Sequence, residues 1–206
     1  MLQKQTVARD TFLLLEELMA IDLLKDFNLA GGTALSLQIG HRTSTDLDFF
    51  GQTTIPLSLV KQEISSQYDY QINVDTKNLL IGFINGVKVD FVNYKYDLIK
   101  PFVLIENIRL LTLEDIACMK LAAITGRGKK RDFFDLYFLL QHFTLHEMLK
   151  MYESKYFDGS LQLVLKSITY FNDAESDENP NLFESLSWDK VKTSIRTAFF
   201  EYYDNL

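Results

Sequence analysis

An Asn-Gly dipeptide between two apolar runs, near the middle of the chain, is the feature that most constrains the fold. The runs NLLIGFI and VKVDFVNY have the composition of β-strands. Asn85-Gly86 lies between them and is the dipeptide preferred in two-residue hairpin turns, where both central residues adopt positive φ. YQINVDT, just upstream, predicts a third strand. The sequence therefore predicts a sheet with an antiparallel component.

Helix and strand patterns are distributed unevenly along the chain. Before the hairpin, TFLLLEELMAIDLL and IPLSLVKQEISSQY predict helices, and FNLAGG and STDLDFF predict strands. Thr33 is expected to cap a short helix, ALSLQIG, that ends at Gly40. After about Leu111 the patterns are helical, with Thr144 and Ser187 as expected caps.

These patterns predict an α+β protein in two parts. Residues 1–110 are expected to form a mixed sheet with helices, and residues 111–206 a helical bundle. We expect the bundle to pack on the sheet domain and to complete an active-site cleft.

The charge of the chain limits its possible partners. The formal net charge is -7, whereas a protein that binds nucleic acid through a broad electrostatic field is normally basic. Any such contact must use a local patch, and GRGKKRD is the densest candidate. Its basic residues are Arg127, Lys129, Lys130 and Arg131. The alternative is a solvated loop without a binding role.

Cysteine content and hydrophobicity exclude further classes. A single cysteine, Cys118, cannot form an internal disulfide, and its apolar surroundings predict a core residue rather than a nucleophile. No stretch approaches the roughly 20 apolar residues that a membrane-spanning helix needs. We therefore expect a cytoplasmic protein without a membrane contact.

Three carboxylates are predicted to lie together. In TDLDFF, strand alternation puts Asp46 and Asp48 on one face, and in VKVDFV it puts Asp90 on the polar face beside Lys88. If the two strands are neighbours, the carboxylates converge, and each close pair of like charges costs about 4 kcal/mol at an effective dielectric near 20. A divalent cation would neutralise such a cluster, and oxygen ligands suit Mg²⁺ or Mn²⁺.

A glycine turn precedes this strand. Gly31-Gly32-Thr33 stands at the start of a predicted helix, where glycine lets the backbone approach a phosphate and free N–H groups favour an anion. Gly-Gly alone is a weak signal, but followed by a helix and Asp-x-Asp it predicts a phosphate cradle beside a metal site. Arg42, between them, is expected either to steady a phosphate or to pair with Asp46.

The run GGTALSLQIGHRTSTDLDFF resembles the signature of the AbiEii/AbiGii-type toxin family, within the nucleotidyltransferase superfamily related in fold to DNA polymerase β. The later stretch LEDIACMKLAAITGRGKKRDFFDLYFLL is similar to the same family. The resemblance covers about Leu29 to about Leu140. Many relatives have a longer C-terminal part, so determinants of substrate choice located there are expected to be reduced or missing in this chain.

The resemblance implies roles for individual residues. Gly32 and Thr33 would hold the triphosphate, while Asp46, Asp48 and Asp90 would bind metal, with Asp90 as the base. Lys120 would contact nucleotide phosphates. Asp132 would be the acidic residue after the basic loop, with Asp135 as the alternative because it lies one helical turn on. Without the resemblance, Lys120 could equally be a lysine that extends to the surface.

The implied reaction is the transfer of a nucleoside monophosphate from an NTP to an acceptor hydroxyl, with Mg²⁺ or Mn²⁺ bound. By analogy the acceptor is RNA such as tRNA, and the protein is the toxin of an abortive-infection system opposed by a winged-helix antitoxin. The alternatives are transfer to a protein or a small molecule, and a non-catalytic nucleotide-binding module.

Overall fold

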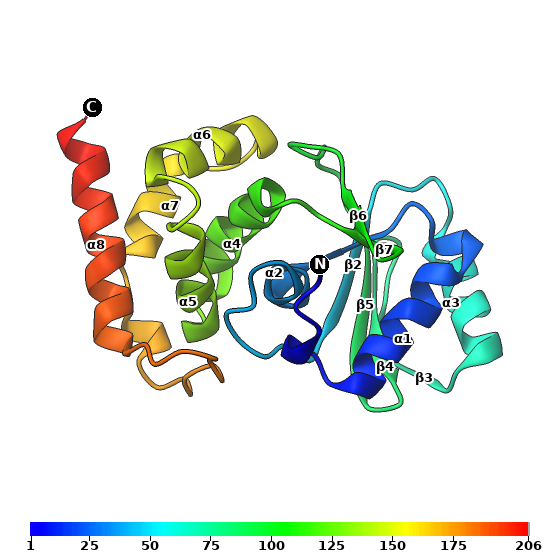
Figure 1. Ribbon diagram of the computed structural model, residues 1–206. Coiled ribbons are helices and arrows are strands. Elements are labelled where there is room, and N and C mark those ends of the chain that lie inside the picture. Colours follow the sequence, from blue (N-terminus) through cyan, green and yellow to red (C-terminus); the bar gives the residue numbers. More distant parts are fainter. Residues whose placement is uncertain (206) are drawn as a thin grey trace. The chain divides into compact units, whose positions relative to one another are not determined.

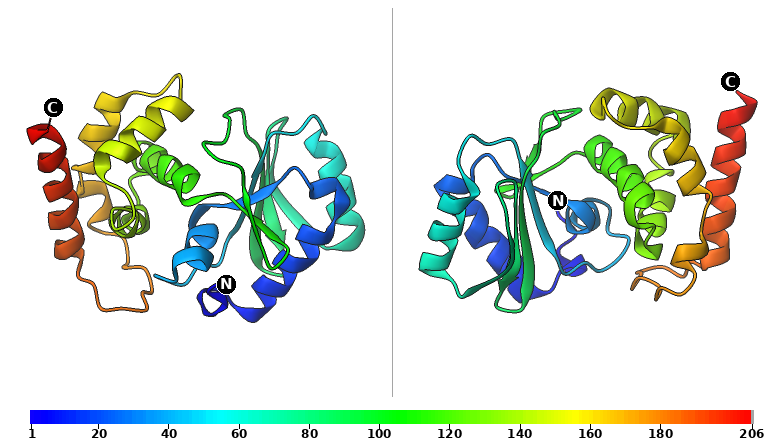
Figure 2. Two further views of the ribbon diagram at one scale, coloured as in Figure 1. Left: turned by 45° about the horizontal axis from the view of Figure 1, so that its top comes forward. Right: turned by 180° about the vertical axis from the view of Figure 1, so that it is seen from behind.

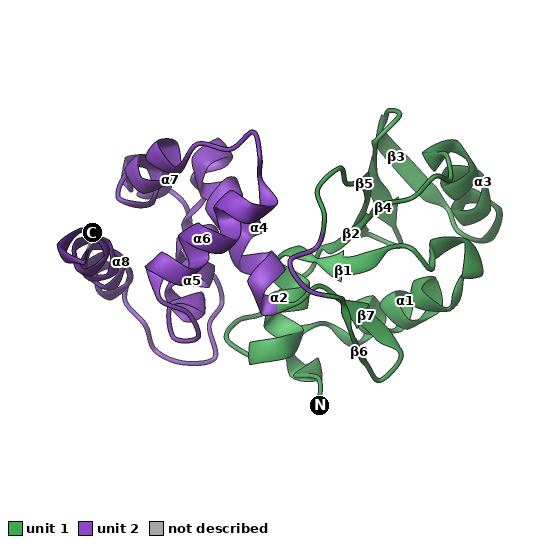
Figure 3. Cartoon of the chain, turned by 90° about the horizontal axis from the view of Figure 1, so that it is seen from above, with its two compact units in different colours: residues 1–97, 101–112 green, residues 98–100, 113–206 purple. Residues whose placement is uncertain are grey.

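The computed structural model describes residues 1–205, so Leu206 of the predicted helical part lies outside the described residues. The chain forms two compact units, which Figure 3 colours separately. The first comprises residues 1–97 and 101–112, and the second comprises residues 98–100 and 113–206. The chain thus passes between units after residues 97, 100 and 112.

The first unit is built on a mixed seven-stranded sheet with the strand order β3-β4-β5-β2-β1-β7-β6 (Figure 1). Two neighbouring pairs, β2 with β5 and β1 with β7, are parallel, and the others are antiparallel. The strands are β1 (Asn28–Ala30), β2 (Leu47–Gly51), β3 (Tyr70–Asp75), β4 (Leu79–Ile84), β5 (Val87–Asn93), β6 (Val103–Ile105) and β7 (Ile108–Leu110).

The predicted hairpin is confirmed. Ile84 on β4 pairs with Val87 on β5, which leaves Asn85 and Gly86 as the two turn residues. Their φ angles are 51° and 80°, the positive values that this tight turn requires. The hairpin fixes the register of β5, and with it the face on which Asp90 lies.

A second hairpin, β6-β7, did not emerge from the sequence. Each of its strands has three residues, too few for a period-2 pattern to be recognised. Its turn residues are Glu106 and Asn107, both with positive φ. Asn107 tolerates this conformation well, whereas Glu106 gives no such signal. The pairing of Leu29 with Leu110 joins the hairpin to β1.

Apolar side chains cross the sheet in one row and form the core of the first unit. Leu29, Phe49, Phe91 and Leu80 pair across β1, β2, β5 and β4, and none is more than 1% exposed. The rings of Phe49 and Phe91 stack with centroids 5.2 Å apart. Burial of such a row is the main stabilising contribution to a half-buried sheet.

Three helices flank this sheet, and the views of Figures 1 and 2 agree on their arrangement. The helices α1 (Arg9–Ala20) and α3 (Leu57–Gln67) cover one face, and α2 (Gly31–Ile39) lies on the other. Short 3₁₀ turns lie before α1, at Lys4–Thr6, and after it, at Asp22–Leu24.

Helix α2 confirms one predicted boundary and corrects the other. It ends at Gly40, which adopts the left-handed conformation with φ 74°. It begins earlier than expected, because Ala30 is the N-cap and Thr33 is already inside the helix. The prediction of Thr33 as the cap was therefore wrong. A hydroxyl after two glycines is a typical cap, but here the bounds of the helix already include both glycines.

The second unit is helical. It contains α4 (Leu113–Arg127), α5 (Lys130–Leu139), α6 (Leu145–Lys155), α7 (Leu161–Ile168), a 3₁₀ turn (Asn172–Ala174) and α8 (Trp188–Asp204). The predicted caps are confirmed, because Thr144 and Glu147 form a reciprocal capping box and Ser187 accepts the N–H of Lys190. Helix α7 had not been predicted.

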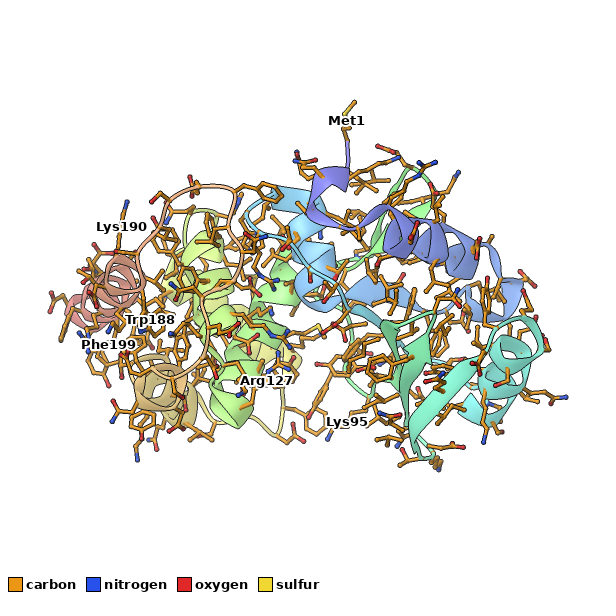
Figure 4. All side chains as sticks on the ribbon, turned by 90° about the horizontal axis from the view of Figure 1, so that it is seen from below. Met1, Lys95, Arg127, Trp188, Lys190 and Phe199 are labelled. Carbon is orange, nitrogen blue, oxygen red and sulfur yellow. The ribbon has the colours of Figure 1, made fainter. Side chains whose placement is uncertain are left out.

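Aromatic packing joins the last helix to the rest of the helical unit. Trp188, at the start of α8, contacts the rings of Phe133, Phe134 and Phe171 at centroid distances of 5.7–5.8 Å. Lys190, two residues on, extends outward from the same helix (Figure 4). Within residues 1–205, no helix combines the length and the apolar character needed to cross a lipid bilayer.

A buried ion pair lies inside the helical unit. Lys155 Nζ on α6 is 2.7 Å from Asp115 Oδ1 on α4, and both side chains have zero exposure. The Asp115 carboxylate also accepts the backbone N–H groups of Ile99 and Lys100. This pair therefore anchors residues 98–100 to the helical unit. No local pattern in the sequence had predicted this pair, because its two residues lie on different helices.

Candidate active site

Asp48 and Asp90 lie directly opposite each other on neighbouring strands. The parallel register of β2 and β5 pairs Asp48 with Asp90, one position away from the pairing of Phe49 with Phe91. Because side chains alternate along a strand, the two carboxylates share the face opposite the apolar row. Ala30 on β1 pairs with Asp48 in the same register. This is also the face on which α2 lies (Figure 2).

Asp90 is held in an unusual electrostatic environment. The residue is 8% exposed, its Oδ2 accepts from Lys88, and its Oδ1 is buried without a hydrogen-bond partner. Burial raises the pKa of the Asp90 carboxyl, the ammonium of Lys88 opposes that rise, and the charge of Asp46 adds to it. A buried carboxylate oxygen without a partner is suited to a proton or a cation.

The predicted metal ligands do not form a recognisable three-ligand site within residues 1–205. Among residues 1–205, no three His, Cys, Asp or Glu side chains are grouped so as to hold a metal ion. The set Asp46, Asp48 and Asp90 thus remains a prediction. The residues nevertheless suit a hard divalent cation, because they offer oxygen ligands and one of those oxygens, Asp90 Oδ1, is buried and unpaired.

The glycine turn lies against the carboxylates. Gly31 has φ 67°, and a β-carbon built on it would be 2.3 Å from Asp48 Oδ2. A β-carbon on Gly32 would be 2.3 Å from an Nη atom of Arg42. A β-carbon at either position would force the contacting side chain to move, and the positive φ of Gly31 favours glycine there as well. The N-terminus of α2 is thus beside one carboxylate and one guanidinium.

Arg42 is buried against this turn. It is 5% exposed, and one of its Nη atoms donates to the carbonyl of Thr43 at 2.9 Å. Its contact with Gly32 puts a positive charge at the helix N-terminus, where the backbone N–H groups also favour an anion. The sequence had left open whether Arg42 steadies a phosphate or pairs with Asp46.

The side chain of Thr33 is buried and makes its hydrogen bonds within the fold. It has zero exposure, and its hydroxyl donates to the carbonyl of Asp46 and contacts the hydroxyl of Ser44 at 2.8 Å. The side chain therefore ties α2 to the loop that leads into β2. Ser44 was missed by the sequence analysis, because a serine in the polar run HRTSTD carries no distinguishing signal.

Lys120 lies within a buried ion cluster of the helical unit. Its Nζ is 2.9 Å from Asp132 Oδ1 and 2.6 Å from Asp135 Oδ2, and its side chain is 6% exposed. The interpretation of Lys120 as a surface lysine is thus excluded. Asp132 and Asp135, which the sequence treated as alternatives, contact the same ammonium.

Arg127 completes this cluster. Its Nε and Nη2 donate to the two oxygens of Asp132 at 2.8 and 3.0 Å. Burial alone would raise the pKa of Asp132, but the charges of Lys120 and Arg127 outweigh it and lower the pKa. Two cations and two carboxylates therefore balance each other in charge.

The predicted basic patch is partly used inside the fold. Arg127 holds Asp132, as described above, and the Lys130 ammonium donates to the carbonyls of Glu175 and Asp177. Lys129, whose side chain is 54% exposed, pairs with Asp177 at 3.3 Å. Arg131 is exposed. Lys129 and Arg131 thus lie at the surface, and Arg127 is half-exposed although it holds Asp132.

Cys118 is a core residue, as predicted. It has zero exposure, and burial raises the pKa of its thiol to about 12. A thiol that stays protonated at neutral pH is a poor nucleophile.

Known proteins resemble this chain over most of its length. The family model described as "Nucleotidyl transferase AbiEii toxin, Type IV TA system" matches residues 13–70 and 70–201. The match extends past the region of about 29 to 140 in which the motifs are recognisable. A relative from Aquifex aeolicus (strain VF5), the uncharacterized protein aq_aa25, is 34% identical over 201 residues, covering 93% of this chain and 95% of its own.

Solved structures share the fold. JHP933 from Helicobacter pylori is 21% identical with a TM-score of 0.60, covering 97% of this chain and 94% of its own. MenT4, a nucleotidyltransferase toxin from Mycobacterium tuberculosis H37Rv, is 16% identical with a TM-score of 0.56, covering 96% and 86%. The family match spans most of the chain and includes the glycine turn and the paired carboxylates, so this protein belongs to the AbiEii family of nucleotidyltransferase toxins, the toxins of type IV toxin–antitoxin systems.

Proposed function

We propose that the protein transfers a nucleoside monophosphate from an NTP to an acceptor hydroxyl, with release of pyrophosphate, and that the reaction depends on Mg²⁺ or Mn²⁺. One observation carries the proposal. Asp48 and Asp90 pair across two parallel strands, and Gly31, which starts α2, is in close contact with Asp48. Nucleotidyl transfer needs carboxylates and a phosphate cradle side by side.

The first unit supplies the binding groups. The backbone N–H groups of Gly32 and Thr33 would hold the triphosphate, and the guanidinium of Arg42 would neutralise part of its charge. Asp46, Asp48 and Asp90 would hold the divalent cation. That cation would stabilise the negative charge that develops on the phosphates and on the leaving pyrophosphate.

Asp90 is the proposed general base. Burial raises the pKa of its carboxyl, which favours acceptance of a proton. Its unpaired Oδ1 is an acceptor that the fold leaves unused. The carboxylate would take the proton of the acceptor hydroxyl as that oxygen attacks the α-phosphorus.

Lys120 is proposed to offset charge on the nucleotide phosphates, with Asp132 and Asp135 as the residues that orient it. Both carboxylates lie within 3 Å of its ammonium, so its position is fixed by two partners. An orientation fixed in advance is what electrostatic stabilisation of a transition state requires.

We further propose that the acceptor is RNA, such as tRNA, and that Lys129 and Arg131 contact its phosphates. Support comes from family analogy and from the exposure of these two side chains in an otherwise acidic protein. Proteins and small molecules are the alternative acceptors. Membership of a type IV system implies an antitoxin partner, and a winged-helix protein is the proposed one.

The test of the activity is incubation of the protein with each labelled NTP, Mg²⁺ and total cellular RNA or protein. Label in the RNA fraction supports the proposal. Label in protein or in small molecules would instead identify one of these as the acceptor. Asp48→Asn and Asp90→Asn should abolish labelling. Labelling that survives both changes would overturn the assignment of the site, and no labelling by any NTP would favour a non-catalytic nucleotide-binding module.

The acceptor contact has a separate test. The double variant Lys129→Ala/Arg131→Ala should reduce RNA labelling while NTP binding stays nearly unchanged. Lys150→Ala/Lys190→Ala removes two exposed lysines from the same unit and serves as the control for net charge. Equal effects of the two double variants would mean that the loop makes no specific contact.

A further inference from the structure

Lys88 contacts the carboxylate at the centre of the site. It lies two residues before Asp90 on β5, so both side chains project from the same face, and its ammonium donates to Asp90 Oδ2. The Lys88 side chain is 33% exposed and that of Asp90 is 11% exposed. One end of the pair is therefore accessible to solvent and the other is buried.

The surroundings of Asp90 explain why a cation is needed there. Asp48 is its direct neighbour across the strands, and the charge of Asp46 also acts on it. Like charges at such spacing repel, and burial strengthens the repulsion because water screens it less. The metal-free site thus requires a positive charge from the protein itself, and the Lys88 ammonium supplies one.

The Lys88 ammonium can also move away from the Asp90 carboxylate. Its side chain has a flexible four-carbon stem, and a third of its surface already faces solvent. Release therefore needs rotation of a side chain and no movement of β5. Asp90 cannot move in the same way, because its strand is paired on both sides.

We infer that Lys88 is the built-in counter-ion of the metal-free site, and that its ammonium and a divalent cation compete for the Asp90 carboxylate. Lys88 is thus a positioning residue that lowers the affinity for metal in the absence of nucleotide. A metal that arrives with the NTP phosphates has additional ligands and displaces it. This inference rests on the proposed metal site.

The first test measures Mn²⁺ binding to the full chain without nucleotide, by electron paramagnetic resonance of the free ion. Removing a competitor should tighten binding, so Lys88→Met should lower the Kd for Mn²⁺ by about fivefold or more, in the usual range of coupling between two sites. Lys88→Arg keeps the charge and should remain near the wild-type value. The control is Lys61→Met, which removes an exposed partner of Asp75 on the same unit.

A second test uses the wild-type protein and does not depend on the folding of a variant. Reductive methylation of lysine, followed by peptide mass spectrometry, reports how accessible each ammonium is. Saturating Mn²⁺ should speed methylation of Lys88, since the ion takes its place on Asp90, and should leave Lys61 unchanged.

The outcomes distinguish a failure of the proposed metal site from a failure of the proposed role of Lys88. Failure of both the wild-type protein and Lys88→Met to bind Mn²⁺ would refute the proposed metal site and this inference with it. A wild-type protein that binds Mn²⁺ with the same Kd as Lys88→Met, or more tightly, would refute the role of Lys88 alone. Unchanged methylation of Lys88 in the presence of bound Mn²⁺ would do the same.

Discussion

Gly31 and Asp48 are in such close contact that a β-carbon on the glycine would lie 2.3 Å from Oδ2 of the carboxylate. The turn that begins α2 and the strand that presents the acidic side chain therefore share one tightly filled space. This contact brings the N–H groups of a helix terminus next to a carboxylate, although the two attract opposite charges. A cation between a phosphate and Asp48 would satisfy both.

Gly31→Ala should therefore impair both stability and catalysis. A non-glycine residue at φ 67° costs about 1–2 kcal/mol, and the clash with Asp48 adds to this cost by displacing the carboxylate. We expect nucleotide transfer to fall by about 100-fold, the typical effect of a misplacement of about 1 Å. The measurements are thermal unfolding and the rate of NTP-dependent labelling.

Gly86→Ala is the matched control for this prediction. Gly86 also has positive φ, but no atom lies within 4 Å of the position of an added β-carbon. Gly86→Ala should lose stability because of its positive φ, but it should keep the wild-type rate of labelling. If both variants lost activity equally, strain alone would account for the effect at Gly31.

Thr33→Val should loosen the loop before β2. The change keeps the shape of a fully buried side chain but removes the donor to the carbonyl of Asp46 and the contact with Ser44. Loss of a buried hydrogen-bond donor costs about 1–3 kcal/mol, measurable by urea unfolding. Because Asp46 follows the same loop, Mg²⁺-dependent activity should fall as well. Thr33→Ser keeps the hydroxyl and should retain most of the stability and most of the activity. If it did not, packing of the Thr33 methyl group would contribute more than the hydrogen bonds of the hydroxyl.

Asp132→Asn should destabilise the helical unit in a pH-dependent way. The pKa of Asp132 is lowered in the folded protein, so its contribution to stability is present above the unfolded value of about 4 and is lost as pH falls through the lower folded value. At pH 7 the variant leaves Lys120 without one of its partners, which should cost about 3–5 kcal/mol.

The difference between Asp132→Asn and wild type should then shrink as the pH is lowered below about 4, where the wild type also loses this charge. Urea unfolding at a series of pH values measures this difference in the free energy of unfolding. Asp177→Asn is the control, since Asp177 also has a lowered pKa but its side chain is partly exposed, and its effect should be much smaller. A difference that stayed constant with pH would exclude the electrostatic explanation.

Lys155→Met should be among the most destabilising single changes in the helical unit. It leaves Asp115 as a buried carboxylate without its cation, at a cost of about 3–5 kcal/mol. Lys61→Met breaks an exposed pair with Asp75 and should cost under about 1 kcal/mol. Chemical denaturation of both variants compares them, and similar costs would mean that Asp115 is satisfied by the N–H groups of Ile99 and Lys100.

Local patterns made much of the first unit predictable. Asn85-Gly86 specified the hairpin, and alternation in STDLDFF and VKVDFV put Asp48 and Asp90 on the polar faces of their strands. Their pairing was a hypothesis, because no local signal tells which strands are neighbours. The parallel register of β2 with β5 comes from packing of the Phe49 and Phe91 rings.

The partners of the buried charges were not predictable. Lys155 is 40 residues from Asp115, and a lysine near the end of an amphipathic helix normally extends into solvent. Arg127 and Lys130 read as members of a basic loop, but their partners, Asp132 and the carbonyls of Glu175 and Asp177, depend on how the helices pack. Lys88 was the exception, since its spacing from Asp90 already put the two on one face.

The pairing of Asp48 with Asp90 has a consequence for how sequences in this family can change. The residues that follow them, Phe49 and Phe91, are paired in the same register and fill the core. A single-residue insertion or deletion between Gly86 and Asp90 would turn the carboxylate inward and a phenylalanine outward at the same time. Proteins with such a length change in β5 should therefore misfold rather than show altered catalysis. Natural variation in activity is expected through substitutions and through the length of the loops.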